Sequence, residues 1–165
     1  MQTTIQIEWK FAHPPATVWQ AWTDPSIAKL WFGSDPNGKV LEAKFDVRVD
    51  GAFSVTFVNS DGSEFTCHGI YQEIDPLNRL VFTWGWVNQP EVNELITLQF
   101  TPAEGGTSML FEQSNIDPKT GLHNYDVGWR STFQKLEKAL DIKSSLYLST
   151  PSSETPPDSP IRNKE

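Results

Sequence analysis

One stretch near the end of the chain restricts the possible folds more than any other. Apolar residues recur there at intervals of three, four and seven: Leu122, Trp129, Phe133, Leu136 and Leu140. This spacing predicts a single apolar stripe along one long helix. A series of short, aromatic-rich segments precedes it. A long helix that follows such a series can bury its stripe against the concave face of a curved sheet, and this pairing often leaves a pocket between the two.

The composition excludes several functional classes. A chain of 165 residues suits one domain, and seven Trp and ten Phe supply a core rich in large rings. The formal charge of −8 and the lack of a basic stripe argue against nucleic-acid binding and anionic membranes. The single cysteine, Cys67, cannot form an intrachain disulfide, and we expect it to be buried. No signal-peptide pattern and no bilayer-length apolar run is visible, so we expect a cytoplasmic protein.

The first part of the chain predicts one strand and two short helices. Apolar and polar residues alternate over residues 5–11, which is typical of a half-buried strand. The two prolines that follow end it, because proline cannot extend a hydrogen-bonded ladder. Apolar residues at helical spacing predict a helix over residues 15–23. Asp24 before Pro25 marks the start of a second short helix, with a capping carboxylate ahead of a proline at its first position.

The middle of the chain predicts further strands, joined by short turns rich in Gly, Asn and Asp. The predicted strands lie at residues 39–49, 53–57, 64–74, 77–86, 96–100 and 107–116. Short turns imply antiparallel pairing. The expected fold class is therefore α+β, with about six to seven antiparallel strands. We expect a folded domain over residues 1–142 and, because residues 143–165 are dominated by Ser, Thr and Pro, a disordered tail.

Four local patterns carry a resemblance to a known family. They are residues 18–25 (VWQAWTDP) followed by 29–32 (KLWF), residues 46–53 (DVRVDGAF), residues 69–84 (GIYQEIDPLNRLVFTW), and His123 with Gly128 and Trp129. In this order they resemble the START-like (SRPBCC, helix-grip) superfamily. The branch is the one named for the C-terminal domain of the activator of a heat-shock chaperone's ATPase. The resemblance covers about residues 1–141, and one loop departs from it, with Phe32-Gly33-Ser34 after Trp31.

The resemblance implies a helix-grip fold, in which a curved antiparallel sheet wraps around the long C-terminal helix. The superfamily includes lipid carriers, hormone receptors, polyketide cyclases and oxygenase subunits, so the fold does not specify one function. We expect binding of a small hydrophobic or aromatic molecule in a cavity between sheet and helix, without catalysis or a cofactor. Two alternatives stay open: a chaperone-interacting module with a role in stress response, and a polyketide cyclase- or hydrolase-like enzyme. Both a monomer and a homodimer remain possible.

The aromatic residues supply the candidate binding site. Alternation through Trp84 and Trp86 places these rings on one sheet face, where they would give a cavity flat apolar walls. The candidate ligand-binding residues are Phe57, Trp84, Trp86, Met109, His123, Trp129 and Phe133. We expect Gly128 to allow close packing of the helix on the sheet, with room for a ligand as the alternative.

Few residues suggest chemistry beyond apolar binding. Glu94 and Gln113 are expected on solvated outer faces of the sheet, although either could be a polar group of the pocket. The three histidines, His13, His68 and His123, show no metal-ligand spacing, so no metal site is expected. No pair of acidic residues suggests acid–base catalysis.

Overall fold

Seven antiparallel strands form one sheet in the order β1-β7-β6-β5-β4-β3-β2. The computed structural model describes residues 3–119 and 122–149, except for the side chains of residues 122–123 and 145–149. The strands are β1 (Ile5–Phe11), β2 (Lys39–Phe45), β3 (Ala52–Val58), β4 (Glu64–Asp75), β5 (Arg79–Trp86), β6 (Gln89–Ala103) and β7 (Gly106–Ser114). Successive strands from β2 to β7 pair as hairpins, and β1 pairs with β7 at the far edge.

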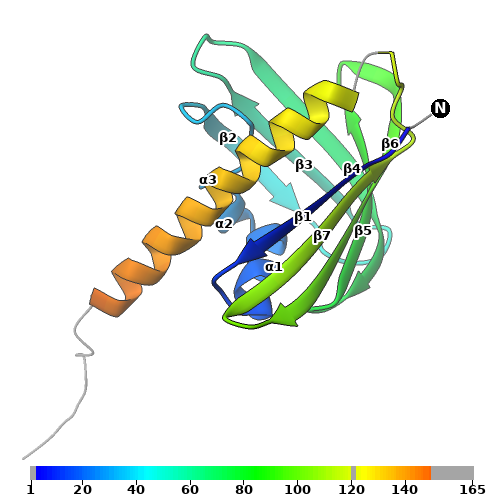
Figure 1. Ribbon diagram of the computed structural model, residues 1–165. Helices are drawn as coiled ribbons and strands as arrows, with labels where there is room; N and C mark the ends of the chain where they lie inside the picture. Colours follow the sequence, from blue (N-terminus) through cyan, green and yellow to red (C-terminus); the bar gives the residue numbers. More distant parts are fainter. Residues whose placement is uncertain (1–2, 120–121, 150–165) are drawn as a thin grey trace, which may run out of the picture.

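Three helices complete the fold: α1 (Pro15–Thr23), α2 (Pro25–Ala28) and α3 (Leu122–Ser149). The sheet curves around α3, which crosses its concave side, while α1 and α2 lie at one end of that side (Figure 1). The α+β helix-grip prediction is thereby confirmed. The predicted start of α2 is also confirmed, since the Asp24 side chain accepts a hydrogen bond from Ser26 N at 2.9 Å and Pro25 follows it.

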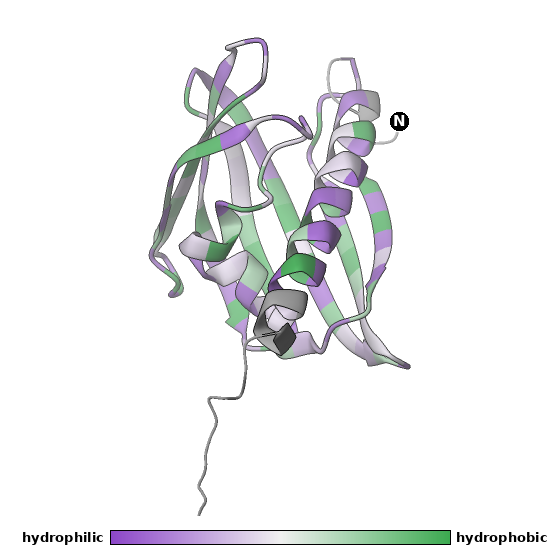
Figure 2. Cartoon of the chain, turned by 90° about the vertical axis from the view of Figure 1, so that its left-hand side faces the viewer, coloured by the Kyte–Doolittle hydropathy of each residue, from purple (hydrophilic) through white to green (hydrophobic). Residues whose placement is uncertain are grey.

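The helix stripe and the inward faces of the strands form one aromatic core. Trp129, Phe133, Leu136 and Leu140 are all buried, as the spacing predicts. Polar and apolar residues alternate along the strands (Figure 2), so one face of the sheet meets the helix and the other meets solvent. Cys67 on β4 is fully buried, and this burial raises the pKa of its thiol.

Several boundaries differ from the expected ones. Strand β2 ends at Phe45 rather than 49, because the chain then turns through Asp50, whose φ is +71°. Strand β6 begins at Gln89 rather than 96, because its early residues pair with the end of β5. Helix α3 continues to Ser149, past the boundary expected at 142. The rest of the expected tail, residues 150–165, lies outside the described residues.

Candidate functional site

A cavity of about 600 Å³ lies between the first turns of α3, strands β3, β5 and β6, and the loop after α2. Its inner wall is aromatic and consists of Phe32, Phe57, Trp84, Trp86, Tyr125 and Trp129. Its rim is polar and exposed and carries Gln89, Glu91, Asn93, Asn115, Asp117 and Asn124. The volume falls in the range of pockets that hold small molecules, roughly 300–1,000 Å³.

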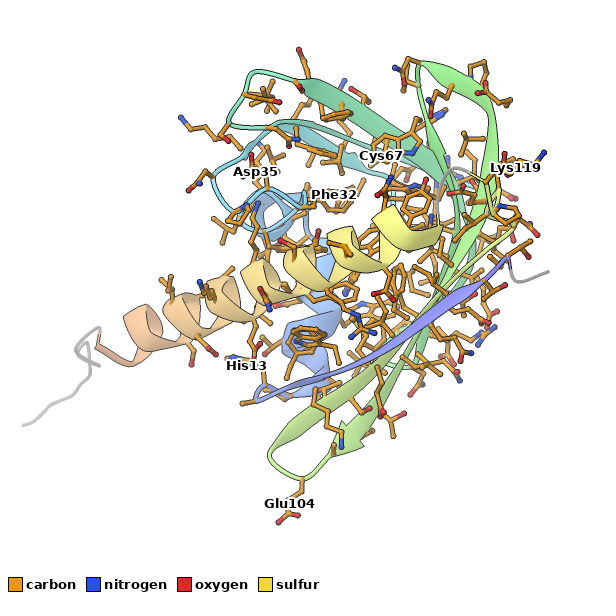
Figure 3. All side chains as sticks on the ribbon, turned by 45° about the horizontal axis from the view of Figure 1, so that its top comes forward. His13, Phe32, Asp35, Cys67, Glu104 and Lys119 are labelled. Atoms are coloured by element: carbon orange, nitrogen blue, oxygen red, sulfur yellow. The ribbon has the colours of Figure 1, made fainter. Side chains whose placement is uncertain are left out.

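The rings of the inner wall meet in both steep and stacked arrangements. Trp84 and Trp86 lie edge to face, with centroids 5.4 Å apart and planes at 84°. Trp84 and Trp129 meet at 61° with centroids 5.3 Å apart, which joins the sheet to the helix. Phe32 stacks on Trp84 with centroids 6.1 Å apart, and it lies between α3 and the β2–β4 side of the sheet (Figure 3). Together these rings offer a ligand both ring faces and ring edges.

A buried chain of hydrogen bonds runs behind this wall. Trp129 Nε1 donates to Gln113 Oε1 at 2.7 Å, and Gln113 Nε2 donates to Glu94 Oε1, also at 2.7 Å. Trp86 Nε1 donates to the Tyr125 hydroxyl at 3.0 Å, and that hydroxyl lies close enough to the Glu94 carboxyl to influence its pKa. These hydrogen bonds link α3, β7, β6 and β5, and they meet at the carboxyl group of Glu94, which lines the cavity.

The environment of Glu94 favours its neutral form. Only 6% of the residue is exposed, and this burial raises the pKa of its carboxyl above the ordinary value. Hydrogen bonds from Tyr125 and Gln113 offset part of that rise. Burial also raises the pKa of Tyr125 to about 12, so its hydroxyl keeps its proton and donates.

The indole N–H of Trp84 is a further buried polar group near Tyr125. Its Nε1 is buried and makes no hydrogen bond of ordinary geometry among the described residues. It lies close enough to the Tyr125 hydroxyl to help lower that group's pKa. A buried N–H without a partner is destabilising, typically by 1–3 kcal/mol. The nitrogen has almost no accessible surface, so this N–H lies within the packed wall and not on the cavity surface.

Glu94 and Gln113 are buried, which corrects the expectation of solvated outer faces. The reason is strand parity, since side chains two residues apart share a face. Glu94 continues the inward series of Ile96 and Leu98 on β6, and Gln113 continues that of Phe111 on β7. The alternation of inward residues along β6 and β7 therefore predicts both positions, but we expected outward positions because both side chains are polar.

The structure places the predicted ligand-binding residues in two environments. Phe57, Trp84, Trp86 and Trp129 line the cavity. Phe133 and Met109 do not: both are fully buried among other core side chains. The backbone of His123 lies in the first turn of α3, and its side chain is outside the described part of the chain. Phe32 and Tyr125, which the sequence did not single out, belong to the wall.

Gly128 lines the cavity instead of packing on the sheet. A Cβ at this position would meet Ser34 Cβ at 3.6 Å, an ordinary van der Waals distance. The expected close packing of helix on sheet is therefore wrong. The absent side chain widens the cavity between α3 and the loop after α2.

Helix α3 holds that loop in place. Ser131 Oγ donates to Ser34 O at 2.6 Å, and Lys135 Nζ donates to Asp35 O at 2.9 Å. Within the loop, Gly33 has a φ of +101°, a conformation that suits glycine. A Cβ there would also lie 3.2 Å from the Phe57 ring. The loop that departs from the family pattern is thus part of the cavity wall.

Other kinds of site find little support in the described residues. Among them, no group of three His, Cys, Asp or Glu side chains could hold a metal ion. The same residues include no helix with the length and apolarity needed to cross a membrane.

We expect the stability of the protein to reveal the buried Glu94. Its pKa is higher in the folded state than in the unfolded state, so between the two values the folded protein holds more protons. Stability must then fall as pH rises through that interval. Relative to Glu94→Gln, the wild type should lose free energy of unfolding as pH increases from about 4.3, the ordinary glutamate value. Urea unfolding at a series of pH values measures this difference.

The exposed Glu91 on the same strand provides the control, since Glu91→Gln removes a carboxyl from the surface and should change stability by no more than about 0.5 kcal/mol. A constant difference between the wild type and Glu94→Gln would show that the carboxyl has the same pKa in the folded and the unfolded protein. The buried environment described above would then be incorrect.

Comparisons with known proteins agree with this architecture. The family model described as Activator of Hsp90 ATPase homolog 1-like protein matches residues 12–141. The chain is similar to a crystal structure of a protein from Chromobacterium violaceum, with 22% identity, coverage of 83% of this chain and 96% of that chain, and a TM-score of 0.74. It is also similar to a crystal structure of a protein from Mesorhizobium loti, with 27% identity, coverage of 84% of this chain and 96% of that chain, and a TM-score of 0.65. The solution structure of an AHSA1-like protein from Aeromonas hydrophila is similar as well, with 19% identity, coverage of 86% of this chain and 94% of that chain, and a TM-score of 0.73. No curated protein matches the chain.

Proposed function

The chain belongs to the family of Activator of Hsp90 ATPase homolog 1-like proteins, and from this premise we propose that it binds a small, flat, largely apolar molecule in the cavity between its sheet and α3. The observation that carries this proposal is the cavity itself, whose aromatic wall ends at a buried carboxyl. A packed core without a ligand role would have no reason to leave such a group beside an empty space.

A thermal-shift screen of flat aromatic compounds, including flavonoids, aromatic polyketides and aromatic amines, tests the proposal. A bound ligand at 100 times its Kd is expected to stabilise the protein by about 2.7 kcal/mol. It should also shift or quench tryptophan emission, because Trp84, Trp86 and Trp129 line the cavity.

A matched pair of helix variants locates the site. Gly128→Leu places a side chain in the cavity without removing any existing contact, so it should abolish binding while the protein stays folded. Val127→Leu makes a similar change at the neighbouring position, which is 55% exposed, and should leave binding intact. If no compound binds, or if Gly128→Leu binds as well as the wild type, the cavity is not the site. The hypothesis of a chaperone-binding surface would then take its place.

Glu94 supports a second candidate function, that of a cyclase- or hydrolase-like enzyme. A buried carboxyl with a raised pKa, close to a tyrosine hydroxyl, has the properties of a general acid or base. Mass spectrometry of each bound compound after incubation decides between the two. An enzyme would change the compound, and Glu94→Gln would stop that change while still binding. A carrier would return the compound unaltered.

A further inference from the structure

The described carboxyl groups that line the cavity have no basic side chain beside them. Glu94 lies inside it, and Glu91 and Asp117 lie on its rim. No Lys, Arg or His is among the described residues that line it, and the chain as a whole has a formal charge of −8. A ligand that enters this space therefore meets a negative potential and no described cation that could pair with an anionic group.

Glu94 also lacks a counter-charge within the described structure. The interactions that set its pKa are burial and the hydrogen bonds from Tyr125 and Gln113, and no cationic side chain contributes. A carboxylate can accept about four hydrogen bonds, so acceptor capacity remains beside these two donors. Buried charges in proteins are usually paired. A cationic donor in the cavity would favour the ionised form of this carboxyl and pair with it.

The aromatic wall suits the same kind of group. Trp84, Trp86 and Phe57 present rings at steep angles, with Phe57 and Trp86 centroids 6.2 Å apart at 63° and Trp84 and Trp86 at 84°. Cations are attracted to the faces of such rings, most strongly to tryptophan, and boxes of this kind recognise ammonium groups. The rings also accommodate the flat apolar body to which the ammonium group is attached.

We propose that the ligand is an amine cation on an aromatic body, with its nitrogen donating to the Glu94 carboxylate within the ring box. This inference rests on the proposed function, since it names the class of molecule that the cavity takes. Fatty acids and other anions are disfavoured, because a second carboxylate beside Glu94 would be repelled and unpaired.

Isothermal titration calorimetry of the full chain with matched probes tests the inference. The probes share one naphthalene ring and differ in charge: naphthylmethylamine is a cation, naphthylmethanol is neutral and naphthoate is an anion. We expect the amine to bind about tenfold more tightly than the alcohol, the scale of one hydrogen bond to a charged group, and the naphthoate to bind most weakly. Glu94→Gln should remove the advantage of the amine. Glu104→Gln, an exposed change in the turn between β6 and β7 and outside the cavity, should alter it by less than about threefold.

The outcomes separate this inference from the proposed function. If the alcohol or the naphthoate binds as tightly as the amine, the cavity is a ligand site but the cation assignment is wrong. The assignment is also wrong if Glu94→Gln, folded by circular dichroism, retains the preference for the amine. If Glu94→Gln does not fold, the order of the three probes on the wild type still decides. If none of the probes binds, both the assignment and the proposed site fail.

Discussion

Phe133→Ala is expected to lower the free energy of unfolding by about 3–5 kcal/mol, the usual cost of removing a large buried ring. Phe133 is fully buried at the centre of the α3 stripe. Its ring contacts Trp9 on β1, Trp22 on α1 and Phe111 on β7, with centroids 5.8, 6.2 and 5.4 Å away. The side chain therefore joins the helix, the sheet and α1. Its removal would leave a cavity among three elements of the core.

Urea unfolding of Phe133→Ala measures this loss, and Val127→Ala provides the control. Val127 lies on the same helix but is 55% exposed, so its truncation should change stability by no more than about 0.5 kcal/mol. Phe133 does not line the cavity, so the variant should still bind ligand at temperatures where it is folded. A loss below about 1 kcal/mol would mean that the core repacks around the missing ring, contrary to the rigid packing inferred here.

Gly69→Ala is expected to lower the free energy of unfolding by about 3 kcal/mol or more, which is the upper end of the usual range for a methyl group added to a packed core. Gly69 lies on β4 opposite Phe53 of β3. A Cβ at residue 69 would overlap the carbonyl oxygen of Thr83 on β5 and lie 2.5 Å from Phe53 Cε1. The Phe53 ring could turn aside, but the Thr83 carbonyl belongs to the backbone. In addition, Ile70 N donates to Thr83 Oγ1 at 2.8 Å, so a shift of β5 would break that bond.

Gly128→Ala is the matched control for Gly69→Ala and should act in the opposite direction. It places a methyl group on an α3 residue with room around it, and the higher helix propensity of alanine should stabilise the protein by about 1 kcal/mol. Thermal or urea unfolding of the two variants gives both values. If Gly69→Ala costs no more than an ordinary surface change, strand β5 can move away from β4 at this point. The close approach seen in the sheet would then not be required for folding.

The elements of the fold were readable in the sequence because each depends on local patterns. The helix stripe from Trp129 to Leu140 and the capping pair Asp24-Pro25 act over a few residues, and the structure has both where the spacing predicts. Strand parity also predicts Glu94 and Gln113 on the inner face, because each continues an apolar series. Their polarity alone suggested the outer face. The ends of strands were less predictable, because they depend on where a neighbouring strand stops.

The site required the tertiary structure. Trp86, Glu94, Gln113 and Tyr125 come from β5, β6, β7 and α3, and no local pattern shows that their polar atoms meet. The same holds for the division of the aromatic residues, with Trp129 on the cavity wall and Phe133, one helical turn later, in the closed core. The sequence by itself determined which residues face inward, because that follows from the periods of strand and helix. Only the curvature of the sheet and the crossing of α3 decided where inward-facing groups touch and where they leave a cavity, since packing is a property of all of them together.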